Sequence, residues 1–108
     1  MGTLIYGNAA HTVEFDDRVL LHLQIVITAK LRRRESFIFS WLESVELGGG
    51  RGSIWLDSTS VLLYRFADSR MPEVDGDWID ALTTSADSGS GLSLVPEPAI
   101  GQEMPSTV

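Results

Sequence analysis

Cysteine is absent from this sequence of 108 residues, which excludes disulfide bonds, thiol catalysis and cysteine-ligated zinc together. Lysine is nearly absent, since Lys30 is the only one beside seven arginines. No run of about 18 apolar residues occurs, so we expect no membrane-spanning segment. The N-terminus also lacks the basic stretch and apolar stretch of a signal peptide. These absences predict a cytoplasmic protein.

The apolar content of the chain is sufficient for one domain. Apolar residues make up 44% of the sequence and charged residues 21%, a balance typical of a folded chain. We expect a single domain over residues 1–95. From Pro96 onward the chain has three prolines and few large apolar residues, so residues 96–108 are expected to form a flexible tail.

The net charge of −7 is unevenly distributed along the chain. Residues 1–52 hold equal numbers of basic and acidic residues, whereas residues 53–108 hold nine acidic residues against Arg65 and Arg70. An acidic surface repels a phosphate backbone. General nucleic-acid binding is therefore disfavoured.

Local patterns predict two helices and six strands. The first helix is predicted from Asp16-Asp17 to about Arg34, because acids suit its N-terminal end and arginines its C-terminal end. Residues 25–28 are mostly β-branched and favour a strand by propensity alone, but the signals at both ends favour the helix. The other predicted elements are strands at residues 3–6, 11–15, 36–42, 53–56, 61–66 and 92–95 and a second helix from Asp75 to about Ala86.

This order, ββαβββαβ, predicts an α+β fold with a mostly antiparallel sheet and two helices packed on one face. The three strands at residues 36–42, 53–56 and 61–66 follow one another without a helix. They are therefore expected to form an antiparallel meander.

One basic cluster lies at the C-terminal end of the first predicted helix, and it has two interpretations. It could bind phosphate groups or an acidic partner together with a later arginine. It would equally serve as a solvated helix end, where basic residues complement the partial negative charge, and we favour this second interpretation. Its members are Lys30, Arg32, Arg33 and Arg34, and the later arginine is Arg51.

The first predicted helix carries two apolar stripes. The broad stripe suits a sheet, whereas Leu21, Ile25 and Ala29 form a second stripe on another side. A helix in a two-layer domain is covered by the sheet on one side only. The second stripe therefore needs another cover, either the second helix or a second copy of the chain, and it is our predicted dimer face.

No motif in the sequence indicates a catalytic, cofactor or metal site. Residues 48–53 are glycine-rich but lack the Gly-Lys-Ser/Thr ending that opens a helix in a phosphate-binding loop. His11 and His22, the only histidines, have no metal-ligand spacing. A hydrolase built on His11 would lack a recognisable nucleophile motif.

The three tryptophans allow a ligand platform, but we expect them in the core. Aromatic residues on strands and helix faces are more often packed inside than exposed. The acids at the start of the second helix are explained by the positive N-terminal end of a helix, without a calcium site. The tryptophans are Trp41, Trp55 and Trp78, and the acids are Asp75, Asp77 and Asp80.

Short segments along nearly the whole chain carry a family resemblance; they lie at residues 1–7, 17–18, 22–24, 29–33, 35–37, 40–41, 53–56, 65–66, 78–82, 91–92 and 95–98. In these segments the chain resembles a family of short actinobacterial proteins of unknown function, many of which carry the label ATP-dependent DNA ligase. Such ligases use the lysine of a Lys-x-Asp-Gly motif. Here Lys30 is followed by Leu31-Arg32-Arg33, so the residues do not support the label.

The sequence thus favours a non-enzymatic protein-interaction module that pairs with itself or with another protein. The alternative is a nucleic-acid accessory protein that uses the basic cluster at residues 30–34 and Arg51. A small hydrolase or ligand-binding enzyme ranks third, and no cofactor is expected.

Overall fold

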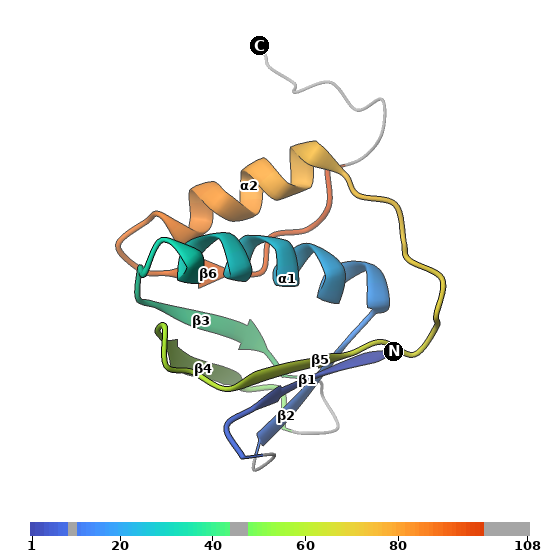
Figure 1. Ribbon diagram of the computed structural model, residues 1–108, viewed down its shortest axis with the longest axis horizontal. Coiled ribbons are helices and arrows are strands. Elements are labelled where there is room, and N and C mark those ends of the chain that lie inside the picture. The colour runs from blue at the N-terminus through green and yellow to red at the C-terminus, as the bar shows by residue number, and fades with distance from the viewer. Residues whose placement is uncertain (9–10, 44–47, 99–108) are drawn as a thin grey trace.

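The computed structural model describes residues 1–8, 11–43 and 48–98. Figure 1 shows both helices on the same side of the first five strands, with α1 between these strands and α2, and the last strand, β6, at the level of α1. The predicted α+β class and the order of elements are therefore confirmed for the described residues. The elements are β1 (Gly2–Tyr6), β2 (His11–Phe15), α1 (Asp17–Arg32), β3 (Phe37–Leu42), β4 (Arg51–Leu56), β5 (Leu62–Arg65), α2 (Gly76–Ala86) and β6 (Leu92–Ser93).

The strands form two three-stranded sheets. In the first sheet β1 lies between β2 and β5 and runs antiparallel to both. In the second sheet β3 lies between β4, which is antiparallel to it, and β6, which is parallel. The predicted meander is therefore right for β3 and β4 and wrong for β5.

The turn after β4 explains why β5 leaves the second sheet. The carboxylate of Asp57 accepts the N–H of Thr59 at 2.9 Å, which closes a tight turn. Beyond this turn the carbonyl of Val61 accepts the N–H of Gly7 at 2.9 Å, so the chain continues beside β1. The other edge of β3 is occupied by β6, which arrives from the far end of the sequence.

The first helix forms as predicted, with residues 25–28 helical inside it. Asp16 occupies the N-cap position, but its side chain makes no capping bond. The carboxylate of Asp17 instead accepts the N–H groups of Ala67 and Asp68, each at 3.0 Å, and so ties the loop after β5 to the helix. The helix ends at Arg32, because Arg34 has a φ of 60° in the left-handed region, where a helix cannot continue.

The second helix begins with a side-chain cap. The Asp75 carboxylate accepts the N–H groups of Asp77 at 3.0 Å and Trp78 at 3.3 Å. After this helix the chain turns at Gly91, whose φ is +85°. A Cβ at that position would lie 2.3 Å from the carbonyl oxygen of Ile38, so only glycine lets β6 approach β3 this closely.

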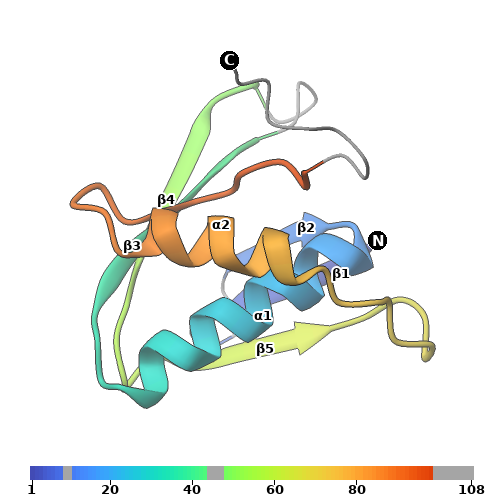
Figure 2. The ribbon, with the colours of Figure 1, turned by 90° about the horizontal axis from the view of Figure 1, so that it is seen from above.

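The core lies between α1 and the two sheets and extends to the inner side of α2 (Figure 2). Two of the three tryptophans confirm the expectation that they pack inside: Trp78 is buried and Trp41 is half-buried against the core. Trp55 is an exception, since 53% of it is exposed. The fully buried side chains include Leu4, Leu20, Leu23, Val26, Ile27, Phe39, Leu56, Leu82 and Leu92.

Candidate interaction surface

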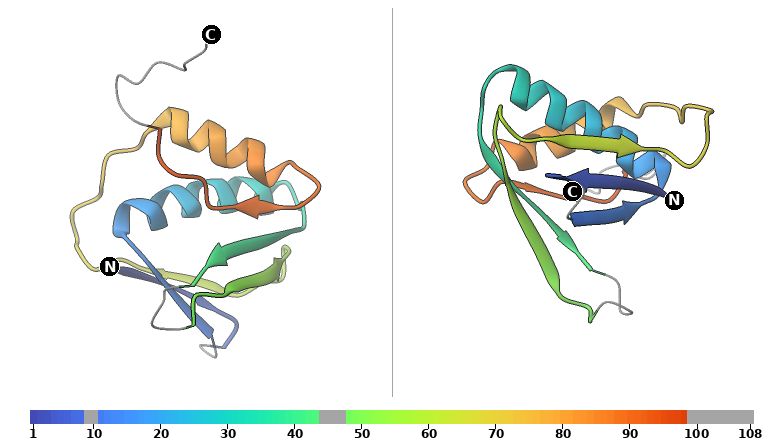
Figure 3. Two further views of the ribbon diagram at one scale, coloured as in Figure 1. Left: turned by 180° about the vertical axis from the view of Figure 1, so that it is seen from behind. Right: turned by 60° about the horizontal axis from the view of Figure 1, so that its bottom comes forward.

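The side of the second sheet that faces away from the helices carries an unusual set of exposed side chains. We call it the outer face; in the right-hand view of Figure 3, β3 and β4 extend side by side downward, beyond the helices. Because side chains alternate along a strand, every second residue of β3 and β4 lies on this side. The outer face consists of Ile38, Ser40 and Leu42 from β3, Arg51, Ser53 and Trp55 from β4, and Ser93 from β6.

Three large apolar residues are exposed on the outer face. Leu42 is 79% exposed, Trp55 is 53% exposed and Ile38 is 41% exposed. Ile38 and Trp55 are cross-strand partners at one end of the face, and Leu42 and Arg51 are partners at the other end. The exposed apolar area is therefore concentrated at both ends of one sheet, as is common at protein contacts.

A row of three serines crosses the middle of the outer face. Ser40 pairs with Ser53 on one side and with Ser93 on the other. The hydroxyls of Ser40 and Ser53 are joined by a hydrogen bond of 2.9 Å. Ser40 is only 9% exposed, so Ser53 and Ser93 form the accessible part of this uncharged row.

The free edge of β6 is closed by α2. The hydroxyl of Ser85 accepts the N–H of Ser93 at 2.9 Å and also contacts the carbonyl of Ser93 at 3.3 Å. A further strand cannot pair with this edge without displacing Ser85. An interaction of the second sheet on this side therefore uses the side chains of the outer face rather than strand addition at β6.

A cavity of about 510 Å³ adjoins the Ile38–Trp55 end of the outer face. Both residues line it, together with the charged side chains of Lys30, Glu35 and Asp87. We call it the Lys30 cavity; its two carboxylates are paired with the ammonium of Lys30 and with the neighbouring guanidinium of Arg33, so these charges balance. Its remaining walls come from Ser36, Phe37 and the loop after α2.

The ammonium of Lys30 is paired with two carboxylates within the Lys30 cavity. The ammonium nitrogen lies 2.7 Å from a carboxylate oxygen of Asp87 and 2.7 Å from one of Glu35, and only 7% of the Lys30 side chain is exposed. The bonds to Asp87 and Glu35 raise the pKa of Lys30. Arg33 and then Lys30 hold the pKa of Glu35 down at about 2, so this carboxylate is charged at neutral pH.

The predicted basic cluster is not assembled into one patch. Lys30 is buried and paired, and Arg33 bonds Glu35 at 3.0 Å. Arg32 and Arg34 are exposed near the end of α1. Arg51 lies at the Leu42 end of the outer face, five residue pairs along the β3–β4 ladder from Phe37, where the chain enters from α1.

The predicted dimer stripe on α1 is not a continuous exposed surface. Leu21 is only 5% exposed, Ile25 is half-buried and Ala29 is exposed. Leu21 is therefore covered by other residues of the same chain. The role of these three residues in a dimer stays a prediction.

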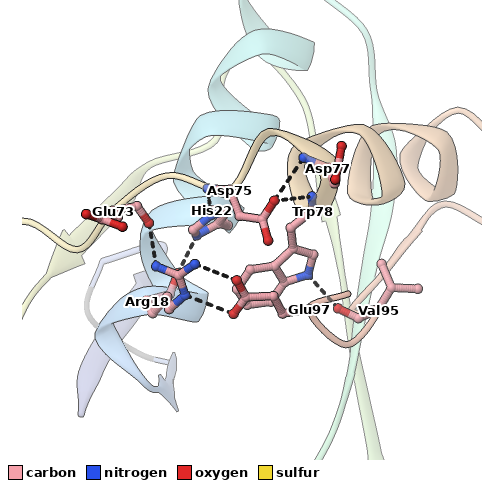
Figure 4. Close-up of polar contacts among 8 residues, drawn as sticks. All are labelled: Arg18, His22, Glu73, Asp75, Asp77, Trp78, Val95 and Glu97. Atoms are coloured by element: carbon pink, nitrogen blue, oxygen red, sulfur yellow. Dashed lines mark hydrogen bonds and ion pairs between the residues drawn. The ribbon is translucent and has the colours of Figure 1, made fainter. Parts of the chain in front are cut away.

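His22 belongs to a polar cluster that joins three segments of the chain (Figure 4). Its Nδ1 donates to the carbonyl of Arg18 at 2.7 Å, and its Nε2 accepts the N–H of Asp75 at 2.9 Å. The ring is fully buried and lies 4.4 Å from that of Trp78, centroid to centroid. Nδ1 fixes the ring on α1 and Nε2 holds the entry to α2, so both ring nitrogens have a structural role.

The same cluster fixes the segment after β6. Trp78 donates its indole N–H to the carbonyl of Val95 at 2.7 Å. Arg18 binds Glu97 through two nitrogens, the first at 2.8 Å, and also donates to the carbonyl of Glu73. Glu97, which the sequence places in the tail, is thus tied to α1, whereas residues 99–108 lie outside the described part of the chain.

Among the described residues, neither histidine belongs to a group that could hold a metal ion. His11 is exposed on β2, where its ring contacts that of Tyr6. Within the described ranges no three His, Asp or Glu side chains lie close enough together to hold a metal ion. Over the same residues, no helix combines the length and apolar character needed to cross a membrane.

Sequence reasoning noted the alternation along β3 but assigned Trp55 to the core. The useful signal was that residues 36–42 carry apolar side chains on both faces of the strand, although only one face can be covered by the helices. Fold and surface together define a small α+β domain with three large apolar residues exposed on one sheet face.

The chain belongs to the family described as domain of unknown function DUF7882, which matches residues 1–97. The family's extent thus includes the whole cluster around His22, up to Glu97. The expected resemblance to a family of unknown function is confirmed at this level. No curated protein and no solved structure shows significant similarity to the chain.

Proposed function

We propose that this chain is a non-enzymatic interaction module that associates with a second copy of itself through the outer face. The observation that carries the proposal is the exposure of Trp55, Leu42 and Ile38 on one sheet face. The side chains of that face include no acid, although the chain as a whole carries a net charge of −7. A second copy can therefore approach this face without the like-charge repulsion that the acidic surfaces impose.

The size of the face predicts a weak association. Six residues of β3 or β4 span about 20 Å, and three strands span about 14 Å, which gives a flat area of about 280 Å² per copy. Stable complexes bury about 800 Å² of accessible surface per partner, so even a rough and well-packed face of this size lies at the low end. We expect a dimer that forms in the micromolar range and exchanges readily.

The position of Lys30 supports a non-enzymatic role. A ligase of the kind named in the label of similar sequences needs a lysine amine that attacks the α-phosphate of ATP. Here the Lys30 ammonium is buried between two carboxylates that raise its pKa, and these carboxylates would repel a triphosphate. The ligase label therefore gains no support from the surroundings of Lys30.

The position of the basic residues gives little support to the alternative of a nucleic-acid accessory protein. It requires the basic residues at positions 30–34 to act together with Arg51, but Lys30 is paired and Arg51 lies at the far end of the hairpin. We keep a cytoplasmic location as part of the proposal, since the chain has no cysteine to suggest an oxidising compartment.

Sedimentation equilibrium at rising protein concentration tests the proposal. The wild-type chain should shift from monomer towards dimer through the micromolar range. Leu42→Asp should abolish this shift, because Leu42 is 79% exposed and the change places a charge in the contact without disturbing the core. Met71→Asp, at a 60% exposed apolar residue outside the outer face, is the matched control and should associate like wild type. A wild-type chain that remains monomeric at high micromolar concentration refutes self-association.

A further inference from the structure

Another cavity, of about 300 Å³, lies between the C-terminal half of α1 and β5, which is an edge strand of the first sheet. Figure 2 shows β5 running alongside α1. We call it the Tyr64 cavity. Part of its lining is apolar, since it includes Ile27 and Leu31, one helical turn apart on α1, and Leu62, two residues before Tyr64 on the same face of β5. Its volume lies at the lower end of the range for small-molecule sites.

The hydroxyl of Tyr64 is buried and has no hydrogen-bond partner among the described residues. Within this part of the chain it is the one buried side-chain polar atom for which this holds. Buried hydroxyls are normally hydrogen-bonded, because desolvation without a partner is unfavourable. Burial also raises the pKa of Tyr64, so the hydroxyl keeps its proton at neutral pH and can donate. The fold therefore leaves a hydrogen-bond donor unused on a residue that lines the cavity.

The charge of the lining favours an anion. Among the described residues, Arg32 is the one charged side chain that lines the Tyr64 cavity, and no acidic side chain does. Arg32 is exposed and forms no ion pair with a described residue, whereas the neighbouring Lys30 and Arg33 are both paired. In a chain with a net charge of −7, this cavity is thus a place where an anion meets a positive charge without acidic neighbours in the lining. The rest of the polar lining consists of Thr28, Ser58 and Ser60.

We propose that the Tyr64 cavity binds a small organic anion, a monocarboxylate with an apolar body. Arg32 attracts the carboxylate, and the hydroxyl of Tyr64 donates a hydrogen bond to the ligand. The apolar body packs against Ile27 and Leu62, a contact that inorganic phosphate could not make. None of these residues belongs to the outer face, so the site is independent of the proposed self-association and adds a ligand to it.

Titration with small carboxylates, followed by the backbone amide NMR signals of the isotope-labelled full chain, tests the inference. Benzoate and hexanoate are the probes, and benzyl alcohol is the uncharged control. Both carboxylates should shift the signals of residues 27–32 and 58–64 saturably, with dissociation constants in the millimolar range expected of such small ligands. Benzyl alcohol should bind at least about fivefold more weakly, since it lacks the charge that Arg32 recognises.

Two variants separate ligand binding from a structural role. Arg32→Gln should weaken benzoate binding about fivefold or more, because it removes the charge at an exposed position. The matched control is Arg34→Gln, at an exposed arginine outside the lining, which should leave binding within about twofold of wild type. Tyr64→Phe should weaken binding about threefold or more. Because the Tyr64 hydroxyl has no partner among the described residues, this change should not lower the midpoint of thermal unfolding.

Several outcomes would overturn the inference. If neither carboxylate gives a saturable shift up to about 20 mM, or if the shifts centre on other residues, the site is refuted. Equal weakening by Arg32→Gln and Arg34→Gln, or equal binding of benzyl alcohol and benzoate, refutes specific recognition of an anion. A Tyr64→Phe chain that binds like wild type, or that unfolds at a lower temperature, refutes the role of the hydroxyl. All of these results leave self-association through the outer face unaffected, since that proposal is tested by sedimentation.

Discussion

Truncation at two positions after β6 should show which part of this segment stabilises the fold. We compare a chain that ends at Pro98 with one that ends at Leu94. The shorter chain loses the carbonyl of Val95, to which Trp78 donates its indole N–H at 2.7 Å, and it loses Glu97, the ion-pair partner of Arg18. Chain ends four residues apart thus differ in two specific contacts.

The magnitude follows from the burial of Trp78. Trp78 is 3% exposed, so its N–H would be left buried without a partner, at a cost of about 1–3 kcal/mol. Loss of the partly buried Val95 side chain adds about 1 kcal/mol. The ion pair of Arg18 adds to the loss in the same direction. For a domain of this size a loss of about 2–4 kcal/mol lowers the midpoint of thermal unfolding by roughly 10–20 °C.

Thermal unfolding followed by circular dichroism measures the difference. The chain that ends at Pro98 should unfold within about 2 °C of the full chain, because the sequence of residues 99–108 offers few large apolar side chains. Trp78→Phe in the full chain should reproduce about 1–2 kcal/mol of the loss, since it removes only the donor and part of the ring. Equal midpoints for the chains that end at Leu94 and at Pro98 would show that the anchor contributes nothing.

Two further predictions concern acid and the first helix. Arg18 lowers the pKa of Glu97 to about 2, and Arg33 with Lys30 lowers that of Glu35 to about 2, against an ordinary value of 4.5. The contribution of these two carboxylates to stability is therefore complete above about pH 5 and is lost as the pH falls from about 4.5 towards 2. Urea unfolding at several pH values would show this loss. A urea midpoint that stays constant over that range would contradict both ion pairs. Leu21→Glu should cost about 3 kcal/mol or more, because it buries a carboxylate without a partner, whereas Ala29→Glu on the same stripe should be nearly neutral in urea unfolding. A folded, stable Leu21→Glu chain would return Leu21 to the candidate dimer face.

The helices were largely predictable because their signals are local. Acids at the start of α1, basic residues at its end and a regular apolar stripe all lie within 20 residues, and they outweighed the β-branched residues 25–28. The sequence did not predict which acid at the start of α1 makes hydrogen bonds. Asp16 has the residue type of a cap, but Asp17 makes the bonds, because the loop after β5 brings the N–H groups of Ala67 and Asp68 to it.

The candidate site could be predicted only in part. Alternation placed Ile38, Ser40 and Leu42 on one face of β3, as the structure has them. The exposure of Trp55 was not evident, since a tryptophan on a strand can lie on either face and the choice depends on which face the helices cover. Lys30 looked like a member of an exposed basic cluster, but its position on α1 turns it inward, where Asp87 from the end of α2 meets it.

The sequence by itself determined the composition of each element, the class of the fold and the absence of cysteine chemistry, because these depend on residue type and on short spacings. Only the tertiary structure decided which strands pair, which charges neutralise one another and which apolar face stays exposed. Those outcomes depend on contacts between residues far apart in the sequence, such as β3 with β6, Lys30 with Asp87 and Arg18 with Glu97. No local pattern specifies such pairs, because each strand or charged residue could pair with several others in the sequence. Only the folded core determines which of them come together.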